Sequence, residues 1–145
     1  MFKHKIQNII KTFNFKMFST SASNQSSEIF LDKINSIGCI TLNRPKQLNA
    51  LNLNMVKEMQ KQLNDCEADP KIKTILIKGA GETAFCAGGD VKSQRSFLLQ
   101  GKFDSAMEFF KEEYKLNYQI SNCKKPYIAL INGVTMGGGV GVFFN

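Results

Sequence analysis

Alternating apolar and polar side chains mark the first folded segment of the chain. Residues 28–42 alternate in this way on both sides of a polar turn at Asn35-Ser36, and two alternating runs joined by a short turn predict a β-hairpin. Pro45 ends the hairpin, because proline has no backbone N–H to donate to a neighbouring strand. The run Ile72–Ile77, in which four of the six residues are apolar, predicts a strand buried on both faces, as in a parallel sheet covered by helices.

Two further stretches space their apolar side chains by three or four residues, which is typical of helices. The first predicted helix covers residues 54–65, with Asn52 or Asn54 as its N-cap. Its apolar face carries Leu53, Val56, Met59 or Gln60, and Leu63. The second predicted helix covers residues 103–121, and its apolar face consists of Phe103, Met107, Phe110, Tyr114 and Asn117. This arrangement leaves Glu113 on the flank of the face, where periodicity alone predicts a solvated charge.

Two glycine-rich loops follow short apolar runs, at residues 74–77 and 127–131. The loops are Ala84-Phe-Cys-Ala-Gly-Gly-Asp90 and Met136-Gly-Gly-Gly-Val-Gly141. Glycine lets a backbone come close to a ligand, and two such loops can present two N–H groups to one oxygen. That arrangement is an oxyanion hole, which stabilises negative charge developing on a carbonyl oxygen. The alternative is that the glycines serve tight turns only.

These loops, together with two other segments, resemble the enoyl-CoA hydratase/isomerase (crotonase) superfamily. The other segments are Ile40–Pro45 with Leu48–Leu51, and Lys125-Pro126 through Asn132-Gly133. Within the superfamily the chain is more similar to the 3-hydroxyisobutyryl-CoA hydrolase branch of valine catabolism. That likeness rests on Phe85-Cys-Ala-Gly-Gly-Asp90, Phe110-Lys-Glu-Glu-Tyr114 and Gly137-Gly-Gly-Val-Gly141.

The resemblance covers roughly residues 28–142 and implies an α/β fold of the crotonase type, a β-β-α superhelix with stacked sheets and flanking helices. We expect residues 28–145 to form a partial crotonase-like acyl-CoA domain, the truncated N-terminal portion of that fold. Strands without their neighbours would leave exposed edges, and an oligomer is compatible with such edges.

The resemblance also implies roles for individual residues. Gly89 and Gly138 match the two family positions whose backbone N–H groups form the oxyanion hole. Glu113, the second acid of Glu-Glu-Tyr, matches a glutamate that contacts substrate in the hydrolase branch.

A second group of residues matches segments that lie along coenzyme A in the family. Ala87, with its neighbours Gly88 and Asp90, resembles the segment that cups the adenine. Arg44 and Lys46 stand in a loop beside the coenzyme A moiety and are candidates for contact with its phosphates. A solvated turn explains these two basic residues equally well.

The expected reaction is therefore hydrolysis of 3-hydroxyisobutyryl-CoA to 3-hydroxyisobutyrate and coenzyme A. Hydratases of the family usually carry a catalytic glutamate two residues beyond the triple glycine, where this chain has Gly141. In the hydrolase branch the catalytic carboxylates come later in the chain, so we expect these residues to provide the oxyanion hole without the general base. Two alternatives stay open: an enoyl-CoA hydratase or isomerase, and a non-catalytic fragment that binds coenzyme A.

Composition narrows the classes of partner and cofactor. The net charge is +7, but four of the 19 basic residues lie in residues 1–27, which contain no acid, so the remainder carries 15 bases against 12 acids. Without a basic stripe, this small excess argues against a nucleic-acid partner. His4 is the one histidine, which excludes a zinc cluster or a Ser/His/Asp triad. No metal or separate cofactor is expected, since coenzyme A is part of the substrate.

The cysteines stand far apart in the sequence, at Cys39, Cys66, Cys86 and Cys123. They form no C-x-x-C pair, and we expect reduced, mostly buried thiols.

Residues 1–27 have the composition of a mitochondrial presequence that directs a protein to the matrix. Phe2, Ile6, Ile9 and Phe13 recur at helical spacing among lysines, serines follow, and acids are absent until Glu28. Amphipathic, basic and acid-free segments of this kind are typical of import signals. A disordered basic tail or a surface-bound amphipathic helix is the alternative. No apolar run approaches the ~18 residues that span a bilayer, so no stable membrane insertion is expected.

Overall fold

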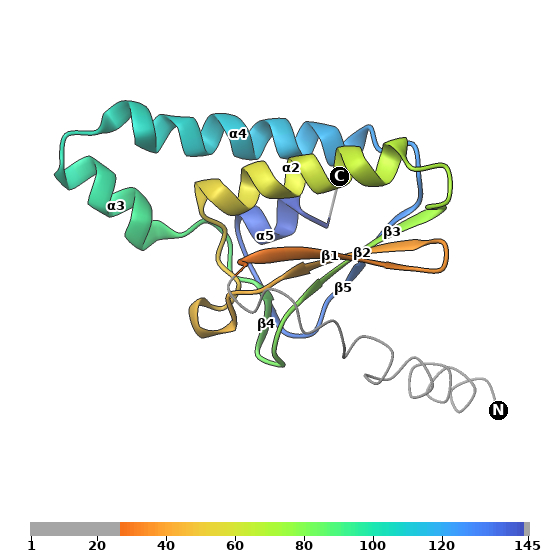
Figure 1. Ribbon diagram of the computed structural model, residues 1–145. Helices are drawn as coiled ribbons and strands as arrows, with labels where there is room; N and C mark the ends of the chain where they lie inside the picture. Colours follow the sequence, from red (N-terminus) through yellow and green to blue (C-terminus); the bar gives the residue numbers. More distant parts are fainter. Residues whose placement is uncertain (1–26, 144–145) are drawn as a thin grey trace.

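The computed structural model describes residues 27–143, which form successive strand–strand–helix units (Figure 1). The first unit consists of β1 (Ile29–Ile34), β2 (Ile37–Leu42), the short 3-10 helix η1 (Pro45–Gln47) and α2 (Leu53–Ala68). The second consists of β3 (Thr74–Gly79), β4 (Ala84–Cys86), α3 (Val91–Leu99) and α4 (Phe103–Ser121). The third consists of β5 (Tyr127–Leu130), β6 (Val134–Thr135) and α5 (Gly138–Gly141). The predicted β-β-α order is confirmed.

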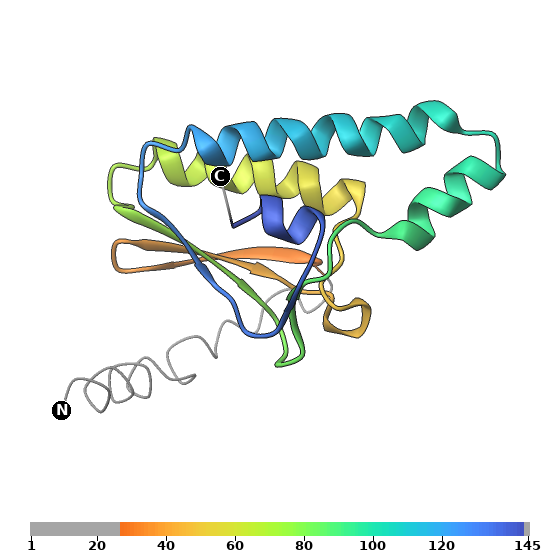
Figure 2. The same cartoon turned by 180° about the vertical axis from the view of Figure 1, so that it is seen from behind.

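The strands form a four-stranded sheet and a two-stranded sheet. The larger sheet has the order β1-β2-β3-β5, with β1 and β2 antiparallel and the remaining neighbours parallel. The smaller sheet pairs β4 with β6 in parallel. Both views place α2 between the large sheet and α4, with α5 on the same side of that sheet (Figures 1 and 2). The hydrophobic core therefore lies between the helices and one face of the large sheet.

The predicted hairpin is confirmed, with β1 and β2 joined at Asn35-Ser36. Asn35 has φ of 53°, a left-handed conformation that asparagine tolerates better than most side chains. The strand predicted at 72–77 is also confirmed, although β3 begins at Thr74. Ile75 and Ile77 are buried in the core, and Leu76, which points to the opposite face of the sheet, is buried too.

The first predicted helix is confirmed as α2, which continues three residues beyond residue 65. Asn52 is its N-cap, because its side chain accepts a hydrogen bond from the Met55 backbone N–H at 2.9 Å. Of the predicted face, Val56, Met59 and Leu63 are buried. The half-buried Gln60 side chain instead donates to the backbone oxygen of Glu112 and thereby links α2 to α4.

The predicted apolar face of α4 was wrong, although its ends were right. Phe103, Met107 and Tyr114 are 63%, 64% and 71% exposed. The buried residues belong to a neighbouring row of the same helix: Ala106, Phe109, Leu116 and Ile120. A helix with apolar side chains on two adjacent rows does not reveal by periodicity which row meets the core. The correction matters for Glu113, because it lies on the inner row.

Helix α3 has no counterpart among the predicted elements. Its residues contribute nothing to the buried core, so the apolar pattern that identifies a core-facing helix is missing. The signal that the sequence does contain is the N-cap. Asp90 accepts a hydrogen bond from the Ser93 backbone N–H at 3.2 Å.

All four cysteines are free thiols, and three of them are buried, as expected. Within residues 27–143, no group of His, Cys, Asp and Glu side chains could hold a metal ion. In the same part of the chain, no helix has both the length and the hydrophobicity needed to cross a membrane. The predicted presequence falls on residues 1–27, of which 1–26 lie outside the described residues.

Candidate functional site

The two glycine loops meet beside the small sheet. Strands β4 and β6 run in parallel, so the loops that follow them leave from the same edge. A Cβ atom built on Gly88 would lie 2.8 Å from the Met136 oxygen and 3.4 Å from the Gly138 nitrogen. One built on Gly138 would lie 3.6 Å from the Gly89 nitrogen. Backbone therefore packs directly on backbone here. Gly88 also needs to be glycine for its φ of 99°.

Two backbone donors in this contact have no acceptor. Among residues 27–143, neither the Gly89 N–H nor the Gly138 N–H donates a hydrogen bond, although the next residue of each loop does. The Asp90 N–H donates to the Leu51 oxygen and the Gly139 N–H to the Met136 oxygen, both at 2.8 Å. Both residues are half-buried, and a backbone N–H group is a strong donor that requires an acceptor. Two of them close together are suited to a single oxygen ligand.

The Glu113 carboxylate reaches the same place from α4. Its Oε1 occupies the position that a Cβ on Gly138 would take. The side chain is half-buried, and within the described residues it has neither a hydrogen bond nor an ion pair. Burial raises the pKa of Glu113. An unpaired carboxylate beside two unpaired N–H groups provides both an acceptor and donors for a polar ligand.

Buried side chains hold the loops in place from below. The Phe109 ring lies 3.1 Å from the position of a Cβ on Gly89. The Cys86 backbone oxygen fills the space beside Gly139. Burial raises the pKa of Cys86 to about 11, and the nearby Glu113 charge adds to the rise. Cys86 therefore stays protonated at neutral pH and packs without acting as a nucleophile.

Asn117 occupies the space beside Gly141. A Cβ on Gly141 would lie 2.8 Å from Oδ1 and 2.9 Å from Nδ2 of Asn117. The Asn117 Oδ1 atom is buried and accepts no hydrogen bond within the described chain. Asn117 follows Glu113 by one helical turn, so α5 packs along α4 with a glycine opposite each polar side chain. Sequence reasoning placed Asn117 on an apolar face and missed this contact.

The structure changes the interpretation of Arg44 and Asp90. Both sequence interpretations of Arg44, as a phosphate contact or part of a solvated turn, assume an accessible guanidinium. Its side chain is only 14% exposed, and it forms ion pairs with Glu28 at 3.0 Å and with Asp90 at 2.9 Å. Asp90 also caps α3. The predicted substrate contacts of these two residues therefore compete with partners inside the protein.

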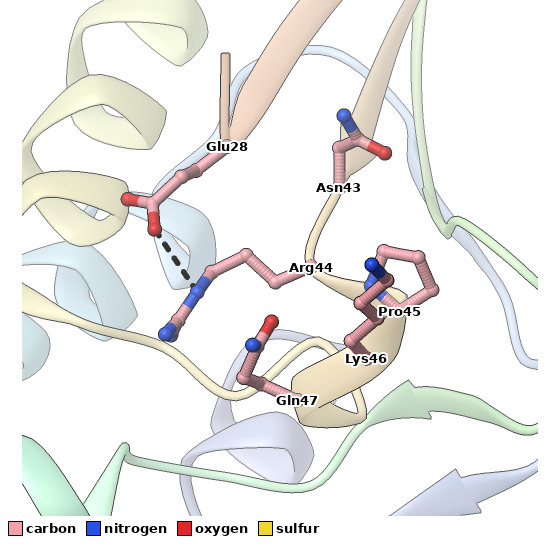
Figure 3. Close-up of a pocket in the computed structure, with 6 residues that line it drawn as sticks. All are labelled: Glu28, Asn43, Arg44, Pro45, Lys46 and Gln47. Atoms are coloured by element: carbon pink, nitrogen blue, oxygen red, sulfur yellow. Dashed lines mark ion pairs between the residues drawn. The ribbon is translucent and has the colours of Figure 1, made fainter. Parts of the chain in front are cut away.

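Lys46 is exposed, as a phosphate contact requires. Figure 3 shows it in an open pocket of about 390 Å³, where Arg44 reaches towards Glu28. The lining residues are Glu28, Asn43, Arg44, Pro45, Lys46 and Gln47. No described residue pairs with the Lys46 ammonium group. Ala87 is half-buried and donates its N–H to the Leu48 oxygen at 3.0 Å.

Asn49 is a site-supporting residue that the sequence analysis missed. It is fully buried, and its amide donates to the backbone oxygens of Ala80 and Ala84 at 2.9 and 2.8 Å. Its φ of 54° follows a φ of 52° at Leu48. An asparagine soon after an Arg-Pro turn is compatible with this left-handed conformation. That is the only signal in the sequence that points to it.

Comparison with known proteins identifies the family. A model of the enoyl-CoA hydratase/isomerase family matches residues 37–145, well over half of the chain. The chain belongs to this family.

The similar proteins carry the names of three different activities. The 3-hydroxyisobutyryl-CoA hydrolase, mitochondrial, of Rattus norvegicus is 50% identical over 84% of this chain, and that of Homo sapiens is 52% identical over 81%. A solved enoyl-CoA hydratase from Rhodobacter sphaeroides superposes with a TM-score of 0.76 at 38% identity, over 80% of this chain and 34% of that one. A carnitinyl-CoA dehydratase from Mycobacterium thermoresistibile superposes with a TM-score of 0.75 at 39% identity. The match covers 81% of this chain and 34% of the dehydratase.

The crotonase-type fold is thus confirmed. The chain spans about a third of the length of its curated relatives, 31% for the rat protein and 30% for the human one.

Proposed function

We propose that this protein takes part in hydrolysis of an acyl-CoA thioester, with 3-hydroxyisobutyryl-CoA as the substrate. The observation that carries the proposal is the convergence of the unpaired N–H groups of Gly89 and Gly138 with the Glu113 carboxylate. The names of relatives about 50% identical support the choice of substrate. The products would be 3-hydroxyisobutyrate and coenzyme A.

In this mechanism the thioester carbonyl oxygen accepts hydrogen bonds from Gly89 and Gly138. Negative charge grows on that oxygen as water attacks the carbonyl carbon, and the two N–H groups stabilise it. One such donor lowers the barrier by about 3 kcal/mol. Because the donors are backbone groups held by packed loops, they need no reorganisation during the reaction.

Glu113 would position the hydroxyacyl group. Its carboxylate is the acceptor at this point, and a hydroxyl on the substrate is the matching donor. Hydrolysis further requires a group that activates water, which is the task of a general base. The residues described here provide the oxyanion hole and the contact with the acyl group.

Coenzyme A would lie along the outer side of the loops. We propose that Ala87 and Gly88 contact the adenine and that Lys46 contacts a phosphate, since its ammonium group is exposed. We further propose a mitochondrial location, in the matrix. The acid-free, lysine-containing composition of residues 1–27 and the word mitochondrial in the relatives' names support it.

Enoyl-CoA hydration is the second candidate, because the solved enoyl-CoA hydratase from Rhodobacter sphaeroides shares the fold at 38% identity. The residue at position 141 argues against hydratase activity. Gly141 has no carboxylate, and Asn117 fills the space that a side chain there would need. A non-catalytic coenzyme A binder is the third candidate.

One experiment separates the three candidates. The whole protein that contains this chain is incubated with 3-hydroxyisobutyryl-CoA and, separately, with crotonyl-CoA, and free thiol and loss of enoyl absorbance are followed. Thiol release above the buffer rate, reduced about 10- to 100-fold in a Glu113→Gln variant, supports the hydrolase. Loss of enoyl absorbance without thiol release identifies a hydratase. Binding without either change identifies the binder.

A further inference from the structure

We propose that Arg44 is a positioning residue that holds the Gly89 N–H in its direction towards the carbonyl oxygen. It does so without touching substrate, by fastening the loop of residues 84–90 to the loop of residues 43–51. The inference deepens the proposed function, since it rests on Gly89 being an oxyanion donor.

The first argument is the pairing of the two loops. Leu51 forms an isolated parallel bridge with Gly89. Its N–H donates to the Gly88 oxygen, and its oxygen accepts from the Asp90 N–H, both at 2.8 Å. In such a bridge the N–H of the central residue faces away from the partner strand. The unpaired direction of the Gly89 N–H is therefore a consequence of how the two loops pair.

The second argument is the reach of the Arg44 guanidinium. Each of its three nitrogens contacts an oxygen from a different segment of the chain. Nε lies 3.0 Å from Glu28, Nη1 donates to the Ala50 oxygen at 2.7 Å, and Nη2 donates to Asp90 at 2.9 Å. Ala50 and Asp90 are the immediate neighbours of the bridged pair Leu51 and Gly89. Arg44 thus links the two loops through the residues next to the bridged pair.

The third argument is chemical. A planar guanidinium presents donors in several fixed directions, whereas a lysine ammonium is a point charge on a flexible stem. Removing Arg44 would also leave the Asp90 carboxylate, in a residue only 8% exposed, without its counter-ion. The backbone N–H of Arg44 is itself held by the Asn49 side chain at 3.0 Å. The backbone of Arg44 is therefore held in place as well, and we call this set of Arg44 contacts the clamp.

The test compares Arg44→Met and Arg44→Lys in the whole protein that contains this chain. Lys33→Met is the matched control, because Lys33 also pairs with an aspartate, Asp69, but lies at the exposed end of the hairpin. Two readouts are taken: kcat and KM for 3-hydroxyisobutyryl-CoA, and amide hydrogen exchange of residues 84–90 in the protein without ligand.

We expect Arg44→Met to lower kcat about 100-fold and to change KM by less than about threefold. A substitution far from the reacting atoms that displaces a catalytic group, here the Gly89 N–H, by about 1 Å can have an effect of that size. Exchange should rise about tenfold within residues 84–90 and stay unchanged in the β1–β2 hairpin, as expected for local opening. Arg44→Lys should fall between the wild type and Arg44→Met. The Lys33→Met control should match the wild type in both readouts.

Two results would overturn the inference. One is an Arg44→Met protein with wild-type kcat and wild-type exchange in residues 84–90. The other is an increase in exchange spread evenly over the chain, hairpin included, which would make Arg44 a general stabiliser. If Arg44→Met does not fold, the charge-retaining Arg44→Lys decides by the same criteria. If the wild-type protein does not hydrolyse the thioester, the proposed function fails, and the exchange comparison alone decides on the clamp.

Discussion

The Glu113 carboxylate lies directly against the backbone of Gly138, in the space that any side chain at position 138 would occupy. The two residues come from α4 and α5, which belong to different strand–strand–helix units. Their contact brings an unpaired carboxylate to the edge of the proposed oxyanion hole. It also explains why position 138 has to be glycine, and it leads to the first prediction.

Gly138→Ala should reduce kcat at least about 100-fold, the effect of losing one oxyanion donor. The new methyl group would collide with the Glu113 carboxylate, and relief of that collision would displace both the carboxylate and the Gly138 N–H group. The protein should still fold, because the displaced atom is the end of a flexible side chain. Steady-state kinetics and thermal unfolding of the purified variant measure both effects.

A double-mutant cycle with Glu113→Ala provides the control. In the Glu113→Ala background the clash is absent, so Gly138→Ala should cost much less activity than in the wild type. Equal losses in both backgrounds would contradict the contact.

Glu113→Gln should weaken catalysis and stabilise the fold at neutral pH. Burial raises the pKa of Glu113 above 4.5, so the folded protein binds this proton more tightly than the unfolded chain does. Stability from this group is complete below pH 4.5 and falls as pH rises through the folded pKa. Glutamine carries no charge, so the Glu113→Gln variant does not lose this stability as pH rises. Urea unfolding at pH 4 and pH 7 should show the variant more stable only at the higher pH.

The same variant should lower kcat/KM for 3-hydroxyisobutyryl-CoA by about 10- to 100-fold, since a hydrogen bond to a charged group contributes about 1.5–3 kcal/mol. A variant with unchanged kcat/KM would remove Glu113 from the proposed site.

Gly141→Glu should not produce a hydratase. The Asn117 amide lies 2.8–3.0 Å from the position of the new Cβ, and overpacking of this kind costs about 1–3 kcal/mol of stability. Adding Asn117→Ala should recover most of the lost stability, because it empties the space. Chemical unfolding of the single and double variants, with crotonyl-CoA hydration as a second assay, measures this. Wild-type stability in Gly141→Glu would mean that Asn117 does not fill the site.

Asp90→Asn should flatten the loss of stability in acid. Burial raises the pKa of Asp90, but hydrogen bonds from the Ser93 backbone and from Arg44 outweigh burial, so the pKa lies below 3.8. A carboxyl group with a lowered pKa contributes stability that is fully present above pH 3.8 and is lost as pH falls through the folded pKa. The wild type should therefore lose more stability than Asp90→Asn between pH 5 and pH 2 in urea titrations. Parallel curves would show that Asp90 has no net favourable partner.

The two helices show how far pattern reasoning reaches. The limits of α4 were predicted correctly at residues 103–121, because apolar side chains recur at helical spacing over the whole length. The inner row was not, because Phe103, Met107 and Tyr114 match a helical period as well as Phe109 and Leu116 do. Helix α3 was missed since it buries no side chain, and burial is what creates an apolar pattern.

The candidate site shows the same division. Gly89, Gly138 and Glu113 were identified by resemblance to a family, whose motifs are local strings of residues. Arg44 stands in such a motif too, but its partners Glu28 and Asp90 lie 16 residues before it and 46 residues after it. No local pattern marks that pairing.

By itself, then, the sequence determined the hairpin, the two long helices, the buried strand and the glycine loops, since each depends on residues close together in the chain. Only the tertiary structure decided which row of α4 is buried, where the Arg44 guanidinium points, and that Asn117 fills the space beside Gly141. These outcomes depend on which segments pack against each other. The parallel pairing of β4 with β6 and the bridge between Leu51 and Gly89 set that packing, and both join residues far apart in the sequence.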